Sequence, residues 1–258
     1  IAQVVGNLET GGAQMLLMEL MRRLDRSRFD PFIIYFKQPS HFDVEIRDKD
    51  WECYRQHMTR SYRVHDLQAL ARLFRELRPE IVHAHSDHAI FGARMAGLTA
   101  GCPHLIAHYH NTYEHRLNDT FHRMESYLAP HTDMFLACSR GVEEFIRERI
   151  DTAGRPVRAL LNGIDLEPYR AARGRREKRR RELDIGPDTY HIIHTARLEP
   201  HKQPGRVLRA VATAAQDPDH PLGEWRLTYV GGGSLRGRLE KELMEIDQRL
   251  QAQGREPM

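Results

Sequence analysis

Short apolar runs alternate with segments whose apolar residues recur every three or four positions, almost from one end of the chain to the other. The second pattern, as at residues 13, 16, 17, 20, 21 and 24, places the apolar side chains on one face of a helix. Strands are expected at Ile1–Gly6, Pro31–Phe36, Ile81–His85, His104–Tyr109, Met134–Ala137 and Val157–Leu161. Helices are expected at Ala13–Leu24, Val64–Leu77, Asp87–Ala100, Leu117–Leu128 and Arg140–Ile150. This alternation is typical of a parallel sheet covered by helices, so the predicted fold class is α/β.

Turn residues and a basic run at 162–187 interrupt the alternation, which then begins again. The second part predicts strands at Tyr190–Thr195 and Trp225–Val230 and helices at Arg206–Ala214 and Leu235–Leu250. We therefore predict a Rossmann-like domain at 1–168, a basic linker at 169–187 and a second Rossmann-like domain at 188–258. Two strands cannot form a doubly wound sheet with both faces covered, so this second domain is expected to be incomplete, with the chain cut off at its carboxyl end.

Composition adds limits to this picture. Of 258 residues, 40% are hydrophobic and 29% charged, as in ordinary globular proteins, and no apolar run approaches the roughly 20 residues of a membrane span. Three separated cysteines and the lack of a visible secretory signal favour a cytoplasmic protein with reduced thiols. The net charge is only +3, but residues 173–182 hold seven basic side chains against two acidic ones. We interpret this run as a solvated helix or linker, in preference to a nucleic-acid or membrane contact.

A glycine turn follows the first predicted strand. Ala13 and Gln14 stand where a phosphate-binding P-loop carries its Lys and Ser/Thr, and the spacing also fails the dinucleotide motif. What remains is Gly11 and Gly12 at the start of a helix, where backbone N–H groups and the helix dipole favour an anion. A plain strand–helix turn explains this segment equally well.

Two loops of the second domain offer groups for a phosphate ligand. Arg197 and Lys202 follow the strand Tyr190–Thr195, at the end where open α/β sheets bind their ligands, and two cations there could hold both phosphates of a diphosphate. The glycines at 231–233 follow the next strand and would let the backbone approach a ligand closely. A tight turn is the alternative explanation of these glycines.

Histidines gather at the ends of two predicted strands. His83, His85, Asp87 and His88 form an HxHxDH pattern that is also found in zinc-dependent hydrolases. Those folds have consecutive antiparallel strands and further ligands, neither of which this chain predicts, so zinc is the less favoured interpretation. His110 follows the next strand, where its side chain would face a substrate cleft or merely the surface. The DxD patterns at 48–50 and 217–219 fall in polar loops and are rejected as metal sites.

Together these segments resemble the retaining GT-B glycosyltransferases of family 4, also called group 1. The segments that carry the resemblance, in the order of the family, are Gly11–Gln14, Val82–Ser86, His108–Asn111, Ala137–Ser139, Leu161–Asp165, Ala196–Lys202 and Val230–Leu235. The resemblance implies two Rossmann-like domains facing a cleft, with the acceptor largely on the first domain and the donor on the second. It also implies transfer of a hexose-type sugar from a nucleotide-diphosphate donor, with retention of configuration and with neither a metal nor another cofactor.

The resemblance also assigns roles to individual residues. Arg197 and Lys202 match the diphosphate-binding pair, and His110 matches the catalytic histidine that contacts the transferring sugar. Gly11 and Gly12 match the turn beside the donor phosphates, and further positions in cleft-lining, substrate-binding motifs are Ser139, Asn162 and Gly232. The implied partners are the nucleotide sugar and a saccharide or lipid-linked acceptor, without nucleic acid, in polysaccharide or glycolipid synthesis.

One departure from the family pattern concerns an acidic E-x7-E element, which would lie beyond the last residue given. We therefore expect the 258-residue chain alone to be inactive or nearly so. A zinc hydrolase, a nucleotide-sugar epimerase and a non-catalytic anion-binding module remain as alternatives. Peripheral contact with the inner membrane face is another open possibility, for which the candidate side chains are Arg22, Arg23, Arg26 and Arg28.

Overall fold

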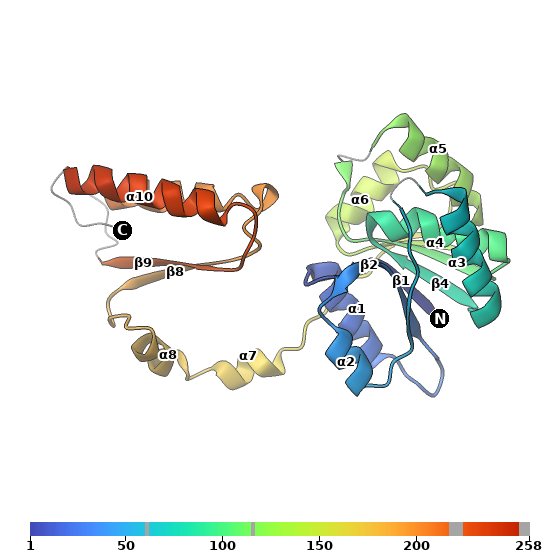
Figure 1. The fold of residues 1–258 in the computed structure, drawn as a ribbon, viewed down its shortest axis with the longest axis horizontal. Helices are drawn as coiled ribbons and strands as arrows, with labels where there is room; N and C mark the ends of the chain where they lie inside the picture. Colours follow the sequence, from blue (N-terminus) through green and yellow to red (C-terminus); the bar gives the residue numbers. More distant parts are fainter. Residues whose placement is uncertain (60–61, 115–116, 217–223, 253–258) are drawn as a thin grey trace. The chain divides into compact units, whose positions relative to one another are not determined.

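The computed structural model describes residues 1–59, 62–114, 117–216 and 224–252. The chain divides into two compact units, Ile1–Asp165 and Leu166–Met258 (Figure 1). The predicted linker overlaps the start of the second unit, where the structure contains two helices, α7 (Glu167–Ala172) and α8 (Arg176–Glu182). The two units are described separately below.

The first unit is built on a seven-stranded sheet in the order β3-β2-β1-β4-β5-β6-β7, and all six strand pairs are parallel. The strands are β1 (Ala2–Leu8), β2 (Phe32–Ser40), β3 (Cys53–Arg55), β4 (Ile81–His85), β5 (His104–Tyr109), β6 (Met134–Ala137) and β7 (Val157–Ala159). The prediction of an α/β fold with a parallel sheet is therefore confirmed. Sequence periodicity missed β3, because three residues are too few to show an alternation.

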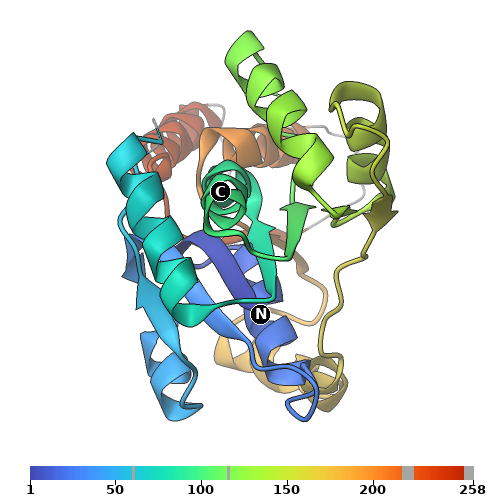
Figure 2. The same cartoon turned by 90° about the vertical axis from the view of Figure 1, so that its right-hand side faces the viewer.

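Helices cover both faces of this sheet (Figure 2). They are α1 (Gly12–Arg23), α2 (Asp43–Asp48), α3 (Val64–Leu77), α4 (Ser86–Ala100), α5 (Asp119–Leu128) and α6 (Arg140–Arg149), with a short 3-10 helix, η2, at Ala129–His131. Leu17 and Met18 of α1 pack in one buried cluster with Val5 of β1. Its neighbour Val4 belongs to a different cluster, with Phe74 of α3. Adjacent residues of β1 thus enter opposite layers, as the two-residue period of a strand requires.

A buried ion pair joins α4 to α5. Arg94 and Glu125 are fully buried, and Nη2 of Arg94 lies 2.5 and 2.8 Å from the two carboxylate oxygens. The hydroxyl group of Tyr109 donates a further hydrogen bond to Glu125, and Arg94 donates to Oγ1 of Thr132 at 2.9 Å. This network satisfies charges that would otherwise be costly inside a protein.

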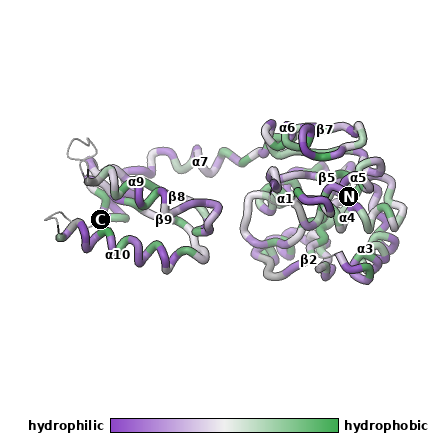
Figure 3. The backbone as a smooth tube through the Cα atoms, turned by 90° about the horizontal axis from the view of Figure 1, so that it is seen from above, coloured by the Kyte–Doolittle hydropathy of each residue, from purple (hydrophilic) through white to green (hydrophobic). Residues whose placement is uncertain are grey.

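The second unit contains β8 (Tyr190–Thr195), η3 (Pro200–Lys202), α9 (Pro204–Gln216), β9 (Trp225–Val230) and α10 (Arg236–Ala252). β8 and β9 are parallel, and the two long helices pack through a small core of Leu198, Leu208, Ala212, Leu239 and Ile246. Hydrophilic and hydrophobic residues alternate along α10, as expected of a helix with one packed face (Figure 3). Across the described parts of both units, no helix is both long and apolar enough to cross a membrane.

Candidate functional site

Four histidines from two neighbouring strands form a compact cluster in the first unit. His83 and His85 belong to β4, His108 to β5, and His110 comes directly after β5. The register pairs His85 with His108, and alternate residues of a strand share a face, so all four side chains lie on the same side of the sheet. The neighbouring rings have their centroids 4.0–5.3 Å apart.

The cluster is held by short contacts between ring nitrogens. Nε2 of His83 lies 3.1 Å from Nδ1 of His108, and Nδ1 of His85 lies 3.1 Å from Nε2 of His110. The second nitrogen of His85, Nε2, lies 2.7 Å from Oε1 of Gln3, which is buried in β1. Both ring nitrogens of His85 therefore have partners.

Burial keeps the four rings neutral. Loss of solvent lowers the pKa of His83 to about 3, of His108 to about 2 and of His110 to about 4, and the pKa of His85 falls well below its ordinary value of 6.5. For His83, His85 and His108, repulsion from other imidazoles of the cluster adds to this effect. At neutral pH these side chains can exchange hydrogen bonds but carry no charge.

Three of these histidines are also placed where a metal ion could be held. Each of His83, His85 and His108 offers a ligand nitrogen, and within the described residues these atoms lie within 4.8 Å of one another. His88, the last residue of the HxHxDH pattern, instead directs Nε2 toward the carbonyl oxygen of Thr59 at 3.2 Å. The side chain of Asp87 lies outside the described residues, as do residues 217–219 of the second rejected DxD pattern. The pattern as a whole therefore does not converge on one point.

The glycine turn lies at the same edge of the sheet. Gly11 precedes α1 and, as a glycine, makes no side-chain cap bond to the first turn of the helix. Gln14 ties the helix to the end of β1, because its amide nitrogen lies 2.7 Å from Oδ1 of Asn7. An added Cβ atom at Gly12 would have no neighbour within 4 Å among the described residues, so space remains beside the turn.

Ser139 and Asn162 have different local roles. The hydroxyl oxygen of Ser139 accepts a hydrogen bond from the backbone N–H of Val142 at 3.2 Å and so caps α6. Asn162 is exposed in the segment that follows β7. The cap alone is sufficient reason for a serine at position 139.

In the second unit the structure joins two motifs that are far apart in the sequence. The backbone N–H of Leu198 donates a hydrogen bond to the carbonyl oxygen of Gly232 at 2.8 Å. The backbone N–H of Leu235 donates to the carbonyl oxygen of Leu198 at 2.9 Å. Glu199 accepts hydrogen bonds from both the N–H and the hydroxyl group of Ser234. The loop after β8 and the glycine-rich loop after β9 thus form one loop pair.

Arg197 and Lys202 stand on this loop pair as exposed cations. Neither side chain makes a hydrogen bond or ion pair with any residue in the described parts of the chain. They are therefore available to a ligand from solvent.

Two of the three glycines at 231–233 are required by close contact. Gly231 and Gly233 have φ values of 148° and 154°, which side chains rarely adopt. A Cβ atom would lie 2.0 Å from the carbonyl oxygen of Ala196 at the first position and 2.5 Å from that of Leu198 at the second. At Gly232, in contrast, an added Cβ would have no neighbour within 4 Å in the part of the chain that the structure describes.

The sequence profile of Glycosyltransferase Family 4 matches residues 10–168. The chain belongs to this family. It is 26% identical over 254 residues to EpsF of Bacillus subtilis (strain 168), which is provisionally named a glycosyltransferase; the match covers 94% of this chain and 64% of EpsF.

Solved structures show that the fold is of the GT-B type. A glycosyltransferase from Rickettsia africae has a TM-score of 0.76 at 19% identity, with 98% of this chain and 65% of that chain covered. Anabaena HepE, solved in complex with UDP-glucose, has a TM-score of 0.69 at 18% identity, with 96% and 65% covered. This family 4 chain therefore spans about 64–65% of the length of these relatives.

Within this family 4 chain, the structure brings some of the predicted site residues together. His110 joins the other three histidines, while Gly11 and Gly12 lie at the same sheet edge. Arg197, Lys202 and Gly232 share the loop pair of the second unit. The relation between the cations of one unit and the glycine turn of the other stays a prediction.

Sequence reasoning missed two polar side chains of these sites. Gln3 interrupts an apolar run of Ala2, Val4 and Val5, and that interruption was the signal available for it. Glu199 gave no signal, because its partner Ser234 is 35 positions away in a separate motif.

Proposed function

We propose that the chain belongs to a glycosyltransferase that moves a hexose-type sugar from a nucleotide-diphosphate donor to an acceptor with retention of configuration. The observation that carries this proposal is the pair of exposed cations, Arg197 and Lys202, on a loop at the carboxyl end of β8. Open parallel sheets bind ligands at this end of their strands. Membership of family 4 supports transfer as the reaction.

The two cations supply the chemistry that the leaving group needs. Departure of a nucleoside diphosphate leaves negative charge on its terminal phosphate, and fixed cations stabilise that charge as it develops. The guanidinium group of Arg197 can hold two phosphate oxygens at once, while Lys202 acts as a point charge. In this proposal no metal ion is needed.

His110 would contact the transferring sugar as a neutral group. Burial lowers its pKa to about 4, so the ring is uncharged at neutral pH. A neutral imidazole can exchange a hydrogen bond with a sugar hydroxyl group but cannot stabilise an anion by its own charge. The diphosphate charge is therefore assigned to the two cations, and sugar orientation to His110.

The solved relative from Anabaena provides a first donor to test. That protein was crystallised with UDP-glucose, and the fold it shares with this chain makes a uridine diphosphate sugar a reasonable starting probe. Because the chain spans about two thirds of the relatives, the activity of the whole protein is part of the proposal.

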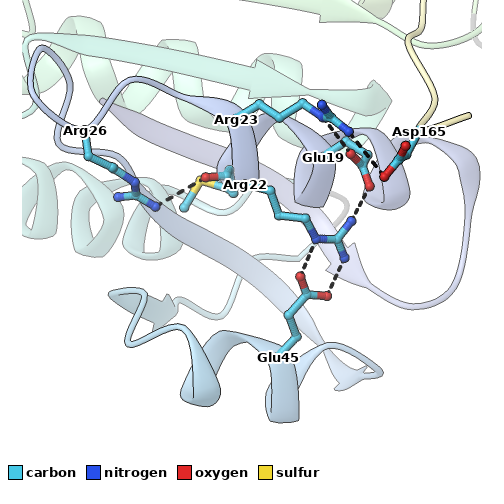
Figure 4. Close-up of polar contacts among 7 residues, drawn as sticks. Glu19, Arg22, Arg23, Arg26, Glu45 and Asp165 are labelled. Atoms are coloured by element: carbon cyan, nitrogen blue, oxygen red, sulfur yellow. Dashed lines mark hydrogen bonds and ion pairs between the residues drawn. The ribbon is translucent and has the colours of Figure 1, made fainter. Parts of the chain in front are cut away.

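The acceptor in this proposal is a saccharide or a lipid-linked sugar. Two arginines of α1 that could meet a membrane surface are engaged within the first unit (Figure 4). Arg22 donates to both carboxylate oxygens of Glu45 at 2.6 Å, and Arg23 pairs with Glu19 at 3.0 Å and Asp165 at 3.6 Å. Their charge is thus largely offset, so α1 offers little positive charge to anionic headgroups.

A zinc-dependent hydrolase is the second candidate, because three histidines lie within ligand distance of one another. It is less favoured, since both nitrogens of His85 are already hydrogen-bonded and the strand pairs within the described residues are all parallel.

Incubation with a panel of nucleotide-diphosphate sugars tests both candidates. We expect one donor to bind in the presence of a zinc chelator. Stoichiometric zinc in the purified protein, lost in His85→Ala, together with no donor binding, would favour the hydrolase and overturn the transferase proposal.

A further inference from the structure

Three polar side chains connect the buried middle of the sheet to its carboxyl edge. Gln3 and His85 are 1% and 0% exposed, whereas His110, the last of the three, is only partly buried. The contacts are 2.7 Å from Oε1 of Gln3 to Nε2 of His85 and 3.1 Å from Nδ1 of His85 to Nε2 of His110. We name this arrangement the Gln3–His85–His110 chain.

The hydrogen-bonding capacity of Gln3 fixes where the protons lie. Its carbonyl oxygen carries no hydrogen, so Nε2 of His85 must donate. A neutral imidazole has only one N–H group, so Nδ1 of His85 is left with a lone pair. Nε2 of His110 must then donate to that lone pair, and Nδ1 of His110 retains a lone pair of its own.

We propose that Gln3 is a positioning residue that sets the tautomer of His110, so that His110 offers an acceptor, the Nδ1 lone pair, to a substrate hydroxyl group. The substrate contact rests on the proposed function, whereas the tautomer does not. Gln3 itself acts through His85.

Packing alone does not explain a glutamine at this position. Gln3 is flanked in sequence by the fully buried residues Ala2, Val4 and Val5. An apolar side chain at position 3 would pack in such a buried strand without needing a hydrogen-bond partner. The register pairs Gln3 with His83, two residues before His85 on the same strand, so its amide reaches the histidine face of the sheet. A buried Nε2–H group without an acceptor would be costly, and Gln3 supplies that acceptor.

The other two histidines, His83 and His108, do not compete for the hydrogen bonds of the Gln3–His85–His110 chain. His83 and His108 pair with each other at 3.1 Å. Within the described residues, Nε2 of His108 is buried without a partner, and an unused lone pair is cheaper there than an unused N–H group. His108 therefore donates from Nδ1 to His83, and the contact between His85 and His110 is left undisturbed.

The test reads the ring nitrogens of His110 by ¹⁵N NMR in the whole chain. In the unmodified protein we expect the proton of His110 on Nε2. In Gln3→Leu, His85 loses its acceptor and should donate from Nδ1 instead, which moves the proton of His110 to Nδ1. His83→Leu, which breaks only the other pair, should keep the original tautomer.

A proton on Nδ1 of His110 in the unmodified protein would overturn the proposal, even if Gln3→Leu failed to fold. So would an unchanged tautomer in folded Gln3→Leu, or a spectrum showing that added zinc binds to His85. For the substrate contact, kcat/KM for transfer by the whole protein should fall about tenfold in Gln3→Leu, the effect of losing one hydrogen bond. If the whole protein shows the expected tautomers and an unchanged kcat/KM, the substrate contact alone is removed. If the whole protein shows no transfer activity with any donor, the proposed function is contradicted and the tautomer result still stands.

Discussion

Glu199 accepts two hydrogen bonds from Ser234, one from its backbone N–H at 3.0 Å and one from its hydroxyl group at 2.7 Å. These bonds lower the pKa of Glu199 and fasten the loop that carries Arg197 and Lys202 to the glycine-rich loop. The position of both cations therefore depends on a residue that itself touches no phosphate in this account.

Replacing Glu199 should separate the effect of its contacts from the effect of its charge. Glu199→Ala removes both bonds, so the loop pair should loosen and the affinity for UDP should fall. Glu199→Gln retains an acceptor and removes a negative charge beside Arg197, so affinity should stay level or rise. Titration calorimetry on both variants checks this, and equal losses in the two would argue against a positioning role.

The three consecutive glycines should respond unequally to substitution. Gly231→Ala and Gly233→Ala introduce a Cβ atom against a carbonyl oxygen at a backbone geometry that only glycine adopts readily. Each should lower the free energy of unfolding of the second unit by about 2 kcal/mol or more. Gly232→Ala is the matched control, because its Cβ has no neighbour within 4 Å among the residues that the structure describes. Urea denaturation compares the three, and a loss at Gly232 as large as at its neighbours would contradict the geometry.

The buried pair of Arg94 and Glu125 should be costly to break from one side. Arg94→Met leaves the carboxylate buried without its partner and should lower the free energy of unfolding by about 3–5 kcal/mol. The double variant Arg94→Met/Glu125→Leu removes both charges and should recover much of that loss. A double variant that is less stable than the single one by a further 3–5 kcal/mol would show that the two side chains act independently.

The histidine cluster should make the first unit sensitive to mild acid. Folding lowers the pKa values of His83, His108 and His110 from 6.5 to about 3, 2 and 4. Between pH 6.5 and 4 the unfolded chain therefore binds protons that the folded chain does not, so stability is complete above pH 6.5 and falls as the pH drops. Each histidine that stays neutral contributes up to about 1.4 kcal/mol per pH unit in this window.

Denaturation curves at several pH values between 5 and 7 measure how steeply the free energy of unfolding changes with pH. This slope gives the number of protons taken up on unfolding. His83→Gln should reduce it by close to one proton. A pH-independent free energy of unfolding over this range would mean that the cluster is accessible to protons in the folded state.

Much of the fold could be predicted from the sequence, because each strand and helix carries its own periodicity. The apolar runs at β4 and β5 and the spacing in α3 are local signals, and the parallel sheet follows from their alternation. Gly232 and Arg197 were also found locally, since motifs at strand ends are continuous in sequence. What could not be predicted are contacts between strands.

Gln3 shows why these contacts escape sequence reasoning. It meets His85 at a separation of 82 residues, and only the register of β1 against β4 decides that the two share a face. Similarly, the HxHxDH spacing suggests one convergent site, yet His88 lies on α4 and faces Thr59. A helix that begins within a motif rotates its later members away from the strand.

The central claim, that Arg197 and Lys202 bind a nucleotide diphosphate, is tested most directly by calorimetric titration of UDP into the unmodified chain and into Arg197→Ala, Lys202→Ala and Arg249→Ala. The account predicts that each of the first two loses roughly 1.5–3 kcal/mol of binding free energy, as for a charged hydrogen bond. It also predicts that Arg249→Ala, an exposed cation near the other end of α10, binds like the unmodified chain. Unchanged affinity in both Arg197→Ala and Lys202→Ala would contradict it.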